Sequence, residues 1–275
     1  MCHLNLNLED REIYDELVEI LILAVIQGVT EWLPLSSSGH LAIAQRFFDL
    51  QLSDQAEVAF DVLLHVGTMC VVLLTFRKDV VNILNALAHH DFEREEGKLA
   101  IFIIVGSIPT TIIGFVFQKF FESLFFNPPA VGVALVATGC FLFISERRKT
   151  GKKLGCVDSL LIGTAQGVAI IPGVSRSGAT IATGLLRKVK REKVFRYSFL
   201  LSVPAVLGAT VVKSRDLVTA NIDMIPLFIG ALTSMVVGYV SLKLLSKIVM
   251  KKKFHVFAYY CWMTGFLVVG WSFLR

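Results

Sequence analysis

Two short polar stretches interrupt apolar sequence, and they constrain the fold more than any other feature. The first, at positions 27–40, reads QGVTEWLPLSSSGH, and the second, at positions 166–180, reads QGVAIIPGVSRSGAT. They align without a gap at a spacing of 139 positions, so that Gln27 corresponds to Gln166. Each contains a proline and glycines, which end a helix and permit a tight turn. The pattern predicts two helix breaks and an internal repeat.

The composition of the whole chain is that of a membrane protein. Hydrophobic residues make up 55% of 275 positions, charged residues 18%, and the mean hydropathy is +0.68. Long apolar runs recur and are continuous rather than alternating, which predicts an all-α polytopic membrane protein and not a β-barrel. The net charge is +5, and the basic residues lie beside the apolar runs. This placement indicates that they set the membrane topology, and we do not expect nucleic acid to be a partner. The acidic N-terminus lacks the basic region of a signal peptide, and we expect it to be retained.

Six segments are long enough to cross about 30 Å of hydrocarbon. We predict transmembrane helices at Val58–Phe76, Leu99–Gln118, Ala130–Ser145, Val194–Val212, Ile222–Leu245 and Phe254–Phe273. The apolar flanks of the first polar stretch, Leu17–Ile26 and Leu41–Phe48, are each too short to span a bilayer. The connecting segments are predicted to be loops, at Arg77–Lys98, Lys119–Pro129, Glu146–Gly155 and Lys213–Asn221. The five cysteines are scattered, and we interpret them as small buried hydrophobes.

The distribution of basic residues predicts the orientation of these helices. Nineteen of the 27 Lys and Arg residues lie in four segments, Arg77–Lys98, Arg147–Lys153, Arg187–Arg196 and Lys247–Lys253, which we assign to the cytoplasm. Two of these segments flank the second polar stretch, so it must enter and leave the membrane on one side, as a re-entrant hairpin. By the same counting, the first hairpin enters from outside. The chain is therefore expected to be a single domain, 1–275, with inverted pseudo-repeats at about 16–146 and 155–275.

The first stretch carries a carboxylate inside apolar sequence, at Glu31. Such a group is costly in a membrane and usually has a function. Gln27 lies four residues earlier, on the same helix face if the helix continues that far. The two side chains are predicted to coordinate a divalent cation or to orient an acid–base group. Capping of neighbouring backbone is the structural alternative for Glu31.

Hydroxyl groups and one histidine follow the carboxylate. Ser36, Ser37 and Ser38 lie in the predicted turn. One of them is expected to cap the next helix, and the others to bind phosphate oxygens or to act as a nucleophile. His40 follows closely, and its imidazole could serve as base, acid or nucleophile. The remaining histidines, at positions 3, 65, 89, 90 and 255, are interpreted as surface or helix positions.

Arg176 in the second stretch is the strongest single signal. A guanidinium is costly in a bilayer without an anionic partner, and its planar fork matches a phosphate group. An internal ion pair with Glu31 is the alternative. Ser175, Ser177 and Thr180 would add hydroxyl groups to the same anion site. Together the two stretches hold groups that suit phosphoryl transfer, which depends mainly on positioning and charge neutralisation.

These two motifs resemble those of the bacitracin-resistance type of undecaprenyl-pyrophosphate phosphatase, an integral membrane family. The resemblance covers essentially the whole chain, and it implies removal of the terminal phosphate from a C55 isoprenoid diphosphate with a divalent cation, Mg²⁺ or Ca²⁺. By position, Gln27 and Glu31 match the acidic motif, His40 the essential histidine, and Ser175 and Arg176 the phosphate-binding pair. Ser37 matches a proposed nucleophile, with His40 assisting proton transfer. Position 27 is glutamate in many members and glutamine here.

The resemblance also implies a cellular role. The product is the monophosphate carrier that is reused for cell-wall precursors, and this recycling confers resistance to bacitracin. We expect a multi-pass protein of the plasma (inner) membrane whose site opens to the outer face. Its partners are a polyprenyl diphosphate and the lipid bilayer, with a homodimer compatible with the sequence. The alternative is a lipid or ion transporter (flippase), because paired re-entrant hairpins in an inverted repeat are also a transporter architecture.

Overall fold

A computed structural model describes residues 8–48, 54–219 and 224–273 of the chain. Over these ranges the backbone is helical, with a single isolated β-bridge and no strand. The helices in the described ranges are α1 (Leu8–Trp32), α2 (Ser37–Phe48), α3 (Asp54–Thr75), α4 (Arg77–Ala88), α5 (Glu95–Val116), α6 (Gln118–Phe125), α7 (Pro128–Glu146), α8 (Cys156–Val168), α9 (Arg176–Leu186), α10 (Arg191–Thr219), α11 (Met224–Met250) and α12 (Val256–Ser272).

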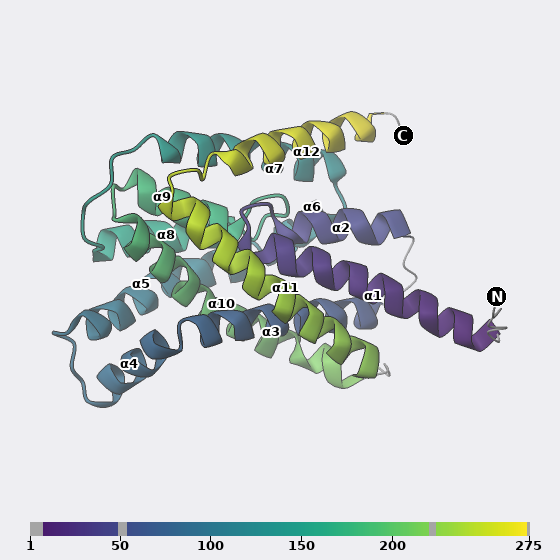
Figure 1. Ribbon diagram of the computed structural model, residues 1–275, viewed down its shortest axis with the longest axis horizontal. Helices are drawn as coiled ribbons and strands as arrows, with labels where there is room; N and C mark the ends of the chain where they lie inside the picture. Colours follow the sequence, from purple (N-terminus) through teal and green to yellow (C-terminus); the bar gives the residue numbers. More distant parts are fainter. Residues whose placement is uncertain (1–7, 49–53, 220–223, 274–275) are drawn as a thin grey trace.

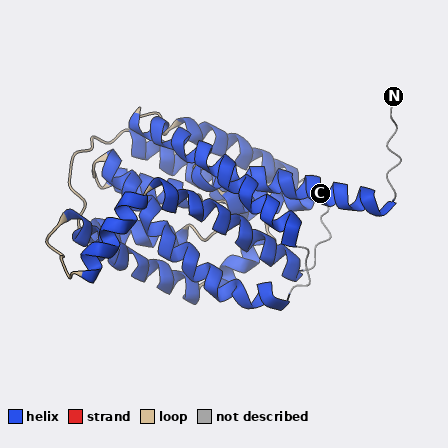
Figure 2. Ribbon diagram, turned by 60° about the horizontal axis from the view of Figure 1, so that its bottom comes forward, coloured by secondary structure: helices blue, strands red, loops and turns tan. Residues whose placement is uncertain are grey.

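The helices form an elongated bundle in which most long helices follow its length (Figures 1 and 2). Five packed pairs make its frame: α1 with α11, α5 with α8, α3 with α11, α3 with α10, and α7 with α12. In Figure 1, α7 and α12 run side by side along one edge, and α1 extends beyond the bundle toward the N-terminus. The broken pairs α1–α2 and α8–α9 also pack together, each as a hairpin.

The outer surface of the bundle is apolar. Four helical segments are long and apolar enough to cross a membrane, Glu95–Val116, Pro128–Glu146, Arg191–Val212 and Ile225–Met250, and two shorter apolar helices are Val62–Thr75 and Val256–Ser272. Large apolar side chains on these helices point outward, among them Phe115 and Leu267, which are 65% and 66% exposed. Exposure on this scale is characteristic of a surface that contacts lipid. The chain is therefore a multi-pass helical membrane protein. Each predicted apolar segment is mainly helical where it is described, but Leu99–Gln118 is broken at Phe117 and the last helix starts at Val256.

Several predicted loops are wrong. Residues 77–88 form α4 and residues 118–125 form α6, within two segments that were expected to be irregular, and α10 continues to Thr219. Ile83 and Ala86 of α4 are buried, as is Phe121 of α6. These short helices are stabilised by one apolar face packed on the bundle, which a search for long apolar runs does not detect.

The first hairpin also differs in length from its prediction. Its first arm is not the short segment Leu17–Ile26 but the 25-residue helix α1, which at 1.5 Å per residue is about 37 Å long. The helix continues through polar sequence at its start and through Glu31 near its end. The position of the break is as predicted: α1 ends at Trp32, two residues before Pro34.

Both breaks depend on backbone conformations that a helix cannot adopt. Ser36 has a φ of +69° between α1 and α2, and Gly173 has a φ of +94° between α8 and α9. A Cβ at position 173 would lie 2.4 Å from the carbonyl oxygen of Val131. Only glycine therefore allows the second break to lie against α7.

The second hairpin returns to the side from which it starts. The backbone N–H groups of Gly151 and Lys152, ahead of α8, both donate to the carbonyl oxygen of Lys188, just after α9, at 2.9 Å. Asp158 in the first turn of α8 forms ion pairs with Lys152 at 2.8 Å and with Arg187 at 2.9 Å. The two ends of the hairpin are thus held side by side.

A buried ion pair joins helix ends at the same side of the bundle. Arg191 of α10 lies 2.8 Å from Glu146 of α7, and both side chains are 9% exposed. The other carboxylate oxygen of Glu146 accepts a hydrogen bond from the backbone N–H of Phe254 at 3.0 Å. The pair therefore connects α7, α10 and the segment before α12.

We expect Glu146→Ala to destabilise the protein by about 3–5 kcal/mol, because it leaves the Arg191 guanidinium buried without its partner. The measurement is the free energy of unfolding in detergent. The matched control is Glu122→Ala, which removes a carboxylate from the exposed face of α6 and is expected to change stability by about 0.5 kcal/mol or less. Equal effects of the two substitutions on the free energy of unfolding would contradict a stabilising role for the Glu146–Arg191 ion pair.

Candidate active site

The two helix breaks meet in the middle of the bundle. The backbone N–H of Gly173 donates to the Ser36 hydroxyl oxygen at 3.0 Å, across 137 positions of sequence. Each break is also held by a neighbouring helix: Thr138 of α7 donates to the Gly173 carbonyl oxygen at 3.2 Å, and the Cys261 thiol of α12 donates to the Pro34 carbonyl oxygen at 3.3 Å. Pro34 and Gly173 occupy corresponding positions of the two stretches. The site is therefore supported in the same way from both halves.

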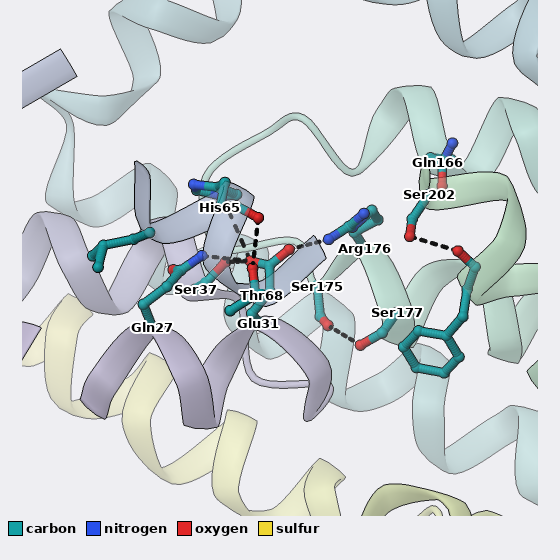
Figure 3. Close-up of polar contacts among 12 residues, drawn as sticks. Gln27, Glu31, Ser37, His65, Thr68, Gln166, Ser175, Arg176, Ser177 and Ser202 are labelled. Atoms are coloured by element: carbon teal, nitrogen blue, oxygen red, sulfur yellow. Dashed lines mark hydrogen bonds and ion pairs between the residues drawn. The ribbon is translucent and has the colours of Figure 1, made fainter. Parts of the chain in front are cut away.

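The Glu31 carboxylate is the centre of this site (Figure 3). One of its oxygens, Oε1, forms an ion pair with the Arg176 guanidinium. The other, Oε2, accepts hydrogen bonds from the Ser37 hydroxyl at 2.6 Å and from Gln27 Nε2 at 3.1 Å, and it lies 3.5 Å from His65 Nε2. Four elements, α1, α2, α3 and α9, thus converge on one carboxylate, and the Glu31 side chain is buried.

Arg176 retains a hydrogen-bond donor that no described residue satisfies. Its Nη2 pairs with Glu31, whereas Nη1 is buried without a partner among the described residues. The guanidinium carbon lies 5.6 Å from the ring centroid of Trp32, which holds the plane of the group by a cation–π contact. A part-buried guanidinium with one buried donor that no described residue pairs, in the first turn of α9, is suited to bind an anion.

The hydroxyl groups near Arg176 divide into two sets. Ser175 is the N-cap of α9, because its oxygen accepts from the Gly178 N–H at 3.1 Å, and it lies 3.3 Å from the Ser177 hydroxyl. Thr180 instead forms a 2.5 Å hydrogen bond with Ser198 of α10. Ser175 therefore caps α9 and contacts Ser177, whereas Thr180 connects α9 to α10.

His40 is placed differently from its expected partnership with Ser37. Its Nδ1 lies 2.9 Å from the Ser36 carbonyl oxygen and must donate to it, so in the neutral imidazole Nε2 accepts from the Tyr260 hydroxyl at 2.8 Å. The hydroxyl of Ser37 donates to Glu31 and not to His40. The geometry favours Glu31 over His40 as acceptor of the Ser37 proton. Ser38, the last hydroxyl of the turn, lies 3.4 Å from Ser36 Oγ.

Sequence reasoning missed several residues of the site. His65 was interpreted as a helix position, and Trp32 and Tyr260 were not considered. A histidine inside a predicted apolar segment was the available signal for His65. Trp32 and Tyr260 carry no such signal, because aromatic residues are common in membrane helices and only the packing brings these two to the site.

A divalent cation fits this set of residues. Among the described residues, no three His, Cys, Asp or Glu side chains form a ready metal cluster. Magnesium needs fewer protein ligands, since one or two carboxylates, water and substrate phosphates complete its shell. Gln27 is fully buried, and its Oε1 has no partner within the described part of the chain. This oxygen and Glu31 are suitable ligands.

The fold and site define a class of protein: a multi-pass membrane protein with a paired carboxylate and guanidinium where two broken helices meet. Comparison with known sequences gives the family. A model of the family described as bacitracin resistance protein BacA matches residues 20–267, and the chain belongs to this family.

Curated relatives match nearly the full chain. An undecaprenyl-diphosphatase of Syntrophotalea carbinolica is 43% identical over 253 residues, which are 89% of this chain and 95% of the relative. An undecaprenyl-diphosphatase of Halothermothrix orenii is 41% identical over 261 residues, 92% of this chain and 97% of the relative. One of Carboxydothermus hydrogenoformans is 38% identical over 260 residues, with 91% and 95% covered. The family resemblance of the two motifs is thus confirmed.

Proposed function

We propose that the protein is a phosphatase that hydrolyses undecaprenyl diphosphate to undecaprenyl monophosphate and inorganic phosphate. Family membership and the names of the relatives support this activity. The observation that carries the proposal is the Arg176 guanidinium, which is paired with Glu31 through one nitrogen and buried without a described partner through the other. The product recycles the lipid carrier for cell-wall synthesis, and this activity accounts for bacitracin resistance.

The contacts of Glu31 suggest how the reaction proceeds. The terminal phosphate binds Arg176 Nη1 and the N–H groups at the start of α9. Ser37 Oγ attacks the terminal phosphorus, its proton passes to Glu31, and the bond from phosphorus to the bridging oxygen breaks, so that undecaprenyl monophosphate leaves. Water then cleaves the phosphoserine. Attack by a water molecule or by His40 gives the same products and remains the alternative to Ser37.

Substrate binding would itself activate the base. A diphosphate competes with Glu31 for the Arg176 guanidinium. A carboxylate that loses its cationic partner becomes a better proton acceptor. Without a cation on the carboxylate, Glu31 would therefore gain basicity when the phosphate is in place, which is when Ser37 must lose its proton. A divalent ion held by Glu31 and Gln27, Mg²⁺ or Ca²⁺ by resemblance, would supply neutralisation of the diphosphate charge.

We further propose the inverted-repeat topology, with six membrane crossings and two re-entrant hairpins. The pattern of helix pairs supports it. In an inverted repeat, α1, α3, α5 and α7 of the first half correspond to α8, α10, α11 and α12 of the second half, in that order. If each helix is replaced by its counterpart, the α1–α11 pair becomes the α8–α5 pair, which is also packed. The same exchange leaves the α3–α10 and α7–α12 pairs unchanged. The basic segments then lie on the cytoplasmic side of the plasma membrane, and the site opens to the outer face.

The architecture also favours one competing function. Inverted repeats with broken helices are typical of transporters, so a flippase is the second candidate. Transport alone does not explain a hydroxyl that donates to a buried carboxylate beside a guanidinium.

We expect the purified protein in liposomes to release phosphate from a C55 isoprenyl diphosphate, and EDTA to reduce the rate at least tenfold. Phosphate release and movement of a labelled lipid between leaflets are measured in the same vesicles. Lipid movement without phosphate release, with or without EDTA, would exclude the phosphatase and favour the flippase.

A further inference from the structure

One histidine lies beside the central carboxylate and has no part in the reaction above. His65 projects from α3, and its Nε2 is 3.5 Å from Glu31 Oε2. Its side chain is 33% exposed, whereas that of Glu31 is 4% exposed. Figure 3 shows His65 and Gln27 approaching Glu31 from two different helices. An imidazole, an amide and a carboxylate therefore meet around one oxygen atom.

Gln27 provides a second and independent observation. Its Nε2 donates to Glu31 Oε2 at 3.1 Å, which places the whole amide at the carboxylate. Its Oε1 is buried and has no partner among the described residues. A buried polar atom without a partner is unfavourable and requires an explanation, and a bound ion is one such explanation. Rotation of the amide by half a turn exchanges its oxygen and nitrogen, and would direct the oxygen toward Glu31.

We propose that Glu31, Gln27 and His65 together form the cation site and that His65 binds the ion directly through Nε2. Two ligands at right angles on an ion, with bonds of about 2.1–2.4 Å, lie about 3.0–3.4 Å apart. The 3.5 Å between His65 Nε2 and Glu31 Oε2 is close to this separation. Ser37 can keep its hydrogen bond and Arg176 its ion pair, because a carboxylate has about four lone-pair positions.

This donor set selects the class of ion. Mg²⁺ and Ca²⁺ prefer oxygen ligands alone, whereas imidazole favours divalent ions of the first transition series. Position 27 supplies a neutral amide, so Glu31 is the one anionic ligand of the proposed site. The imidazole of His65 would strengthen the binding of transition-series ions. We therefore expect Mn²⁺ to bind more tightly than Mg²⁺ or Ca²⁺. This inference rests on the proposed function only in placing the ion at the catalytic carboxylate.

The test is electron spin-echo spectroscopy of protein without a polyhistidine tag, loaded with Mn²⁺ alone. An imidazole on the ion gives ¹⁴N modulation, which we expect in the wild type and not in His65→Gln. His65→Gln should also weaken Mn²⁺ binding at least tenfold. The matched control is His89→Gln, since His89 is exposed at the end of α4, and it should change neither quantity.

Two further measurements distinguish a failure of the inference from a failure of the variant to fold and from a failure of the proposed function. Labelling of wild-type protein with ¹⁵N-histidine should alter the modulation, which tests direct binding of an imidazole even if His65→Gln does not fold. Absence of Mn²⁺ binding, or Mn²⁺ bound without imidazole modulation, would overturn the inference. If the inference fails but the wild type releases phosphate, the proposed phosphatase activity still stands. If imidazole modulation is seen but no phosphate is released, the proposed function is overturned and the cation site still stands.

Discussion

Arg176→Ala is expected to lower kcat/KM for an isoprenyl diphosphate at least 100-fold. Removal of one preorganised donor to a developing oxyanion lowers the rate by about 10²–10³. In the described structure, Arg176 is also the only arginine or lysine that forms an ion pair with Glu31. Arg176→Lys should recover part of the loss, because it keeps the charge and loses the planar fork. Arg148→Ala, on the exposed segment after α7, is the control and should leave kcat/KM within twofold. Phosphate release under initial-rate conditions is the measurement.

The structural and catalytic contributions of Arg176 can be separated. Removal of the guanidinium leaves a buried carboxylate without its cation, which destabilises a protein by about 3–5 kcal/mol. The double variant Glu31→Gln, Arg176→Ala removes both charges, so it should regain thermal stability and remain inactive. Recovery of activity in the double variant would contradict a catalytic role for both Arg176 and Glu31.

The position of both breaks could be predicted from the sequence because the residues that cause them are local. Pro34 ends α1, and Gly173 alone allows the positive φ of the second break. The meeting of the breaks was predicted from the repeat and from the charge distribution, since two hairpins that enter from opposite faces would approach each other within the membrane. The ion pair of Glu31 and Arg176 was foreseen as an alternative to phosphate binding. The structure contains this pair and leaves a donor of Arg176 for an anion as well.

The partners of each side chain could not be predicted, because they depend on packing between helices. His40 lies three positions after Ser37, yet its ring contacts Tyr260 of α12, 220 positions away. His65 reaches Glu31 because α3 packs beside α1. The short helices α4 and α6 were missed for the same reason, since their apolar faces are buried only in the folded bundle.

Ser37→Ala is expected to lower kcat at least 100-fold if Ser37 is the nucleophile. Its hydroxyl lies 2.6 Å from Glu31 Oε2, which is a hydrogen bond short enough for proton transfer to a carboxylate. Ser123→Ala is the control, because that hydroxyl donates to a backbone carbonyl on the exposed face of α6. Rapid quenching of the wild type should trap a phosphate ester on the peptide that contains Ser37. Loss of activity in Ser37→Ala without a trapped ester would instead assign the attack to water and leave Ser37 as a positioning residue.

The contacts of His40 predict a different outcome for Tyr260→Phe under each alternative. If His40 Nε2 attacks phosphorus, the Tyr260 hydroxyl blocks its lone pair at 2.8 Å, and Tyr260→Phe should raise kcat. If Ser37 attacks, the hydroxyl of Tyr260 only orients the imidazole, and its loss should lower kcat by about tenfold or less. Because Ser37 donates to Glu31 while both ring nitrogens of His40 are engaged elsewhere, we expect the decrease. An increase in kcat, with a phosphate trapped on His40, would transfer the role of nucleophile from Ser37 to His40.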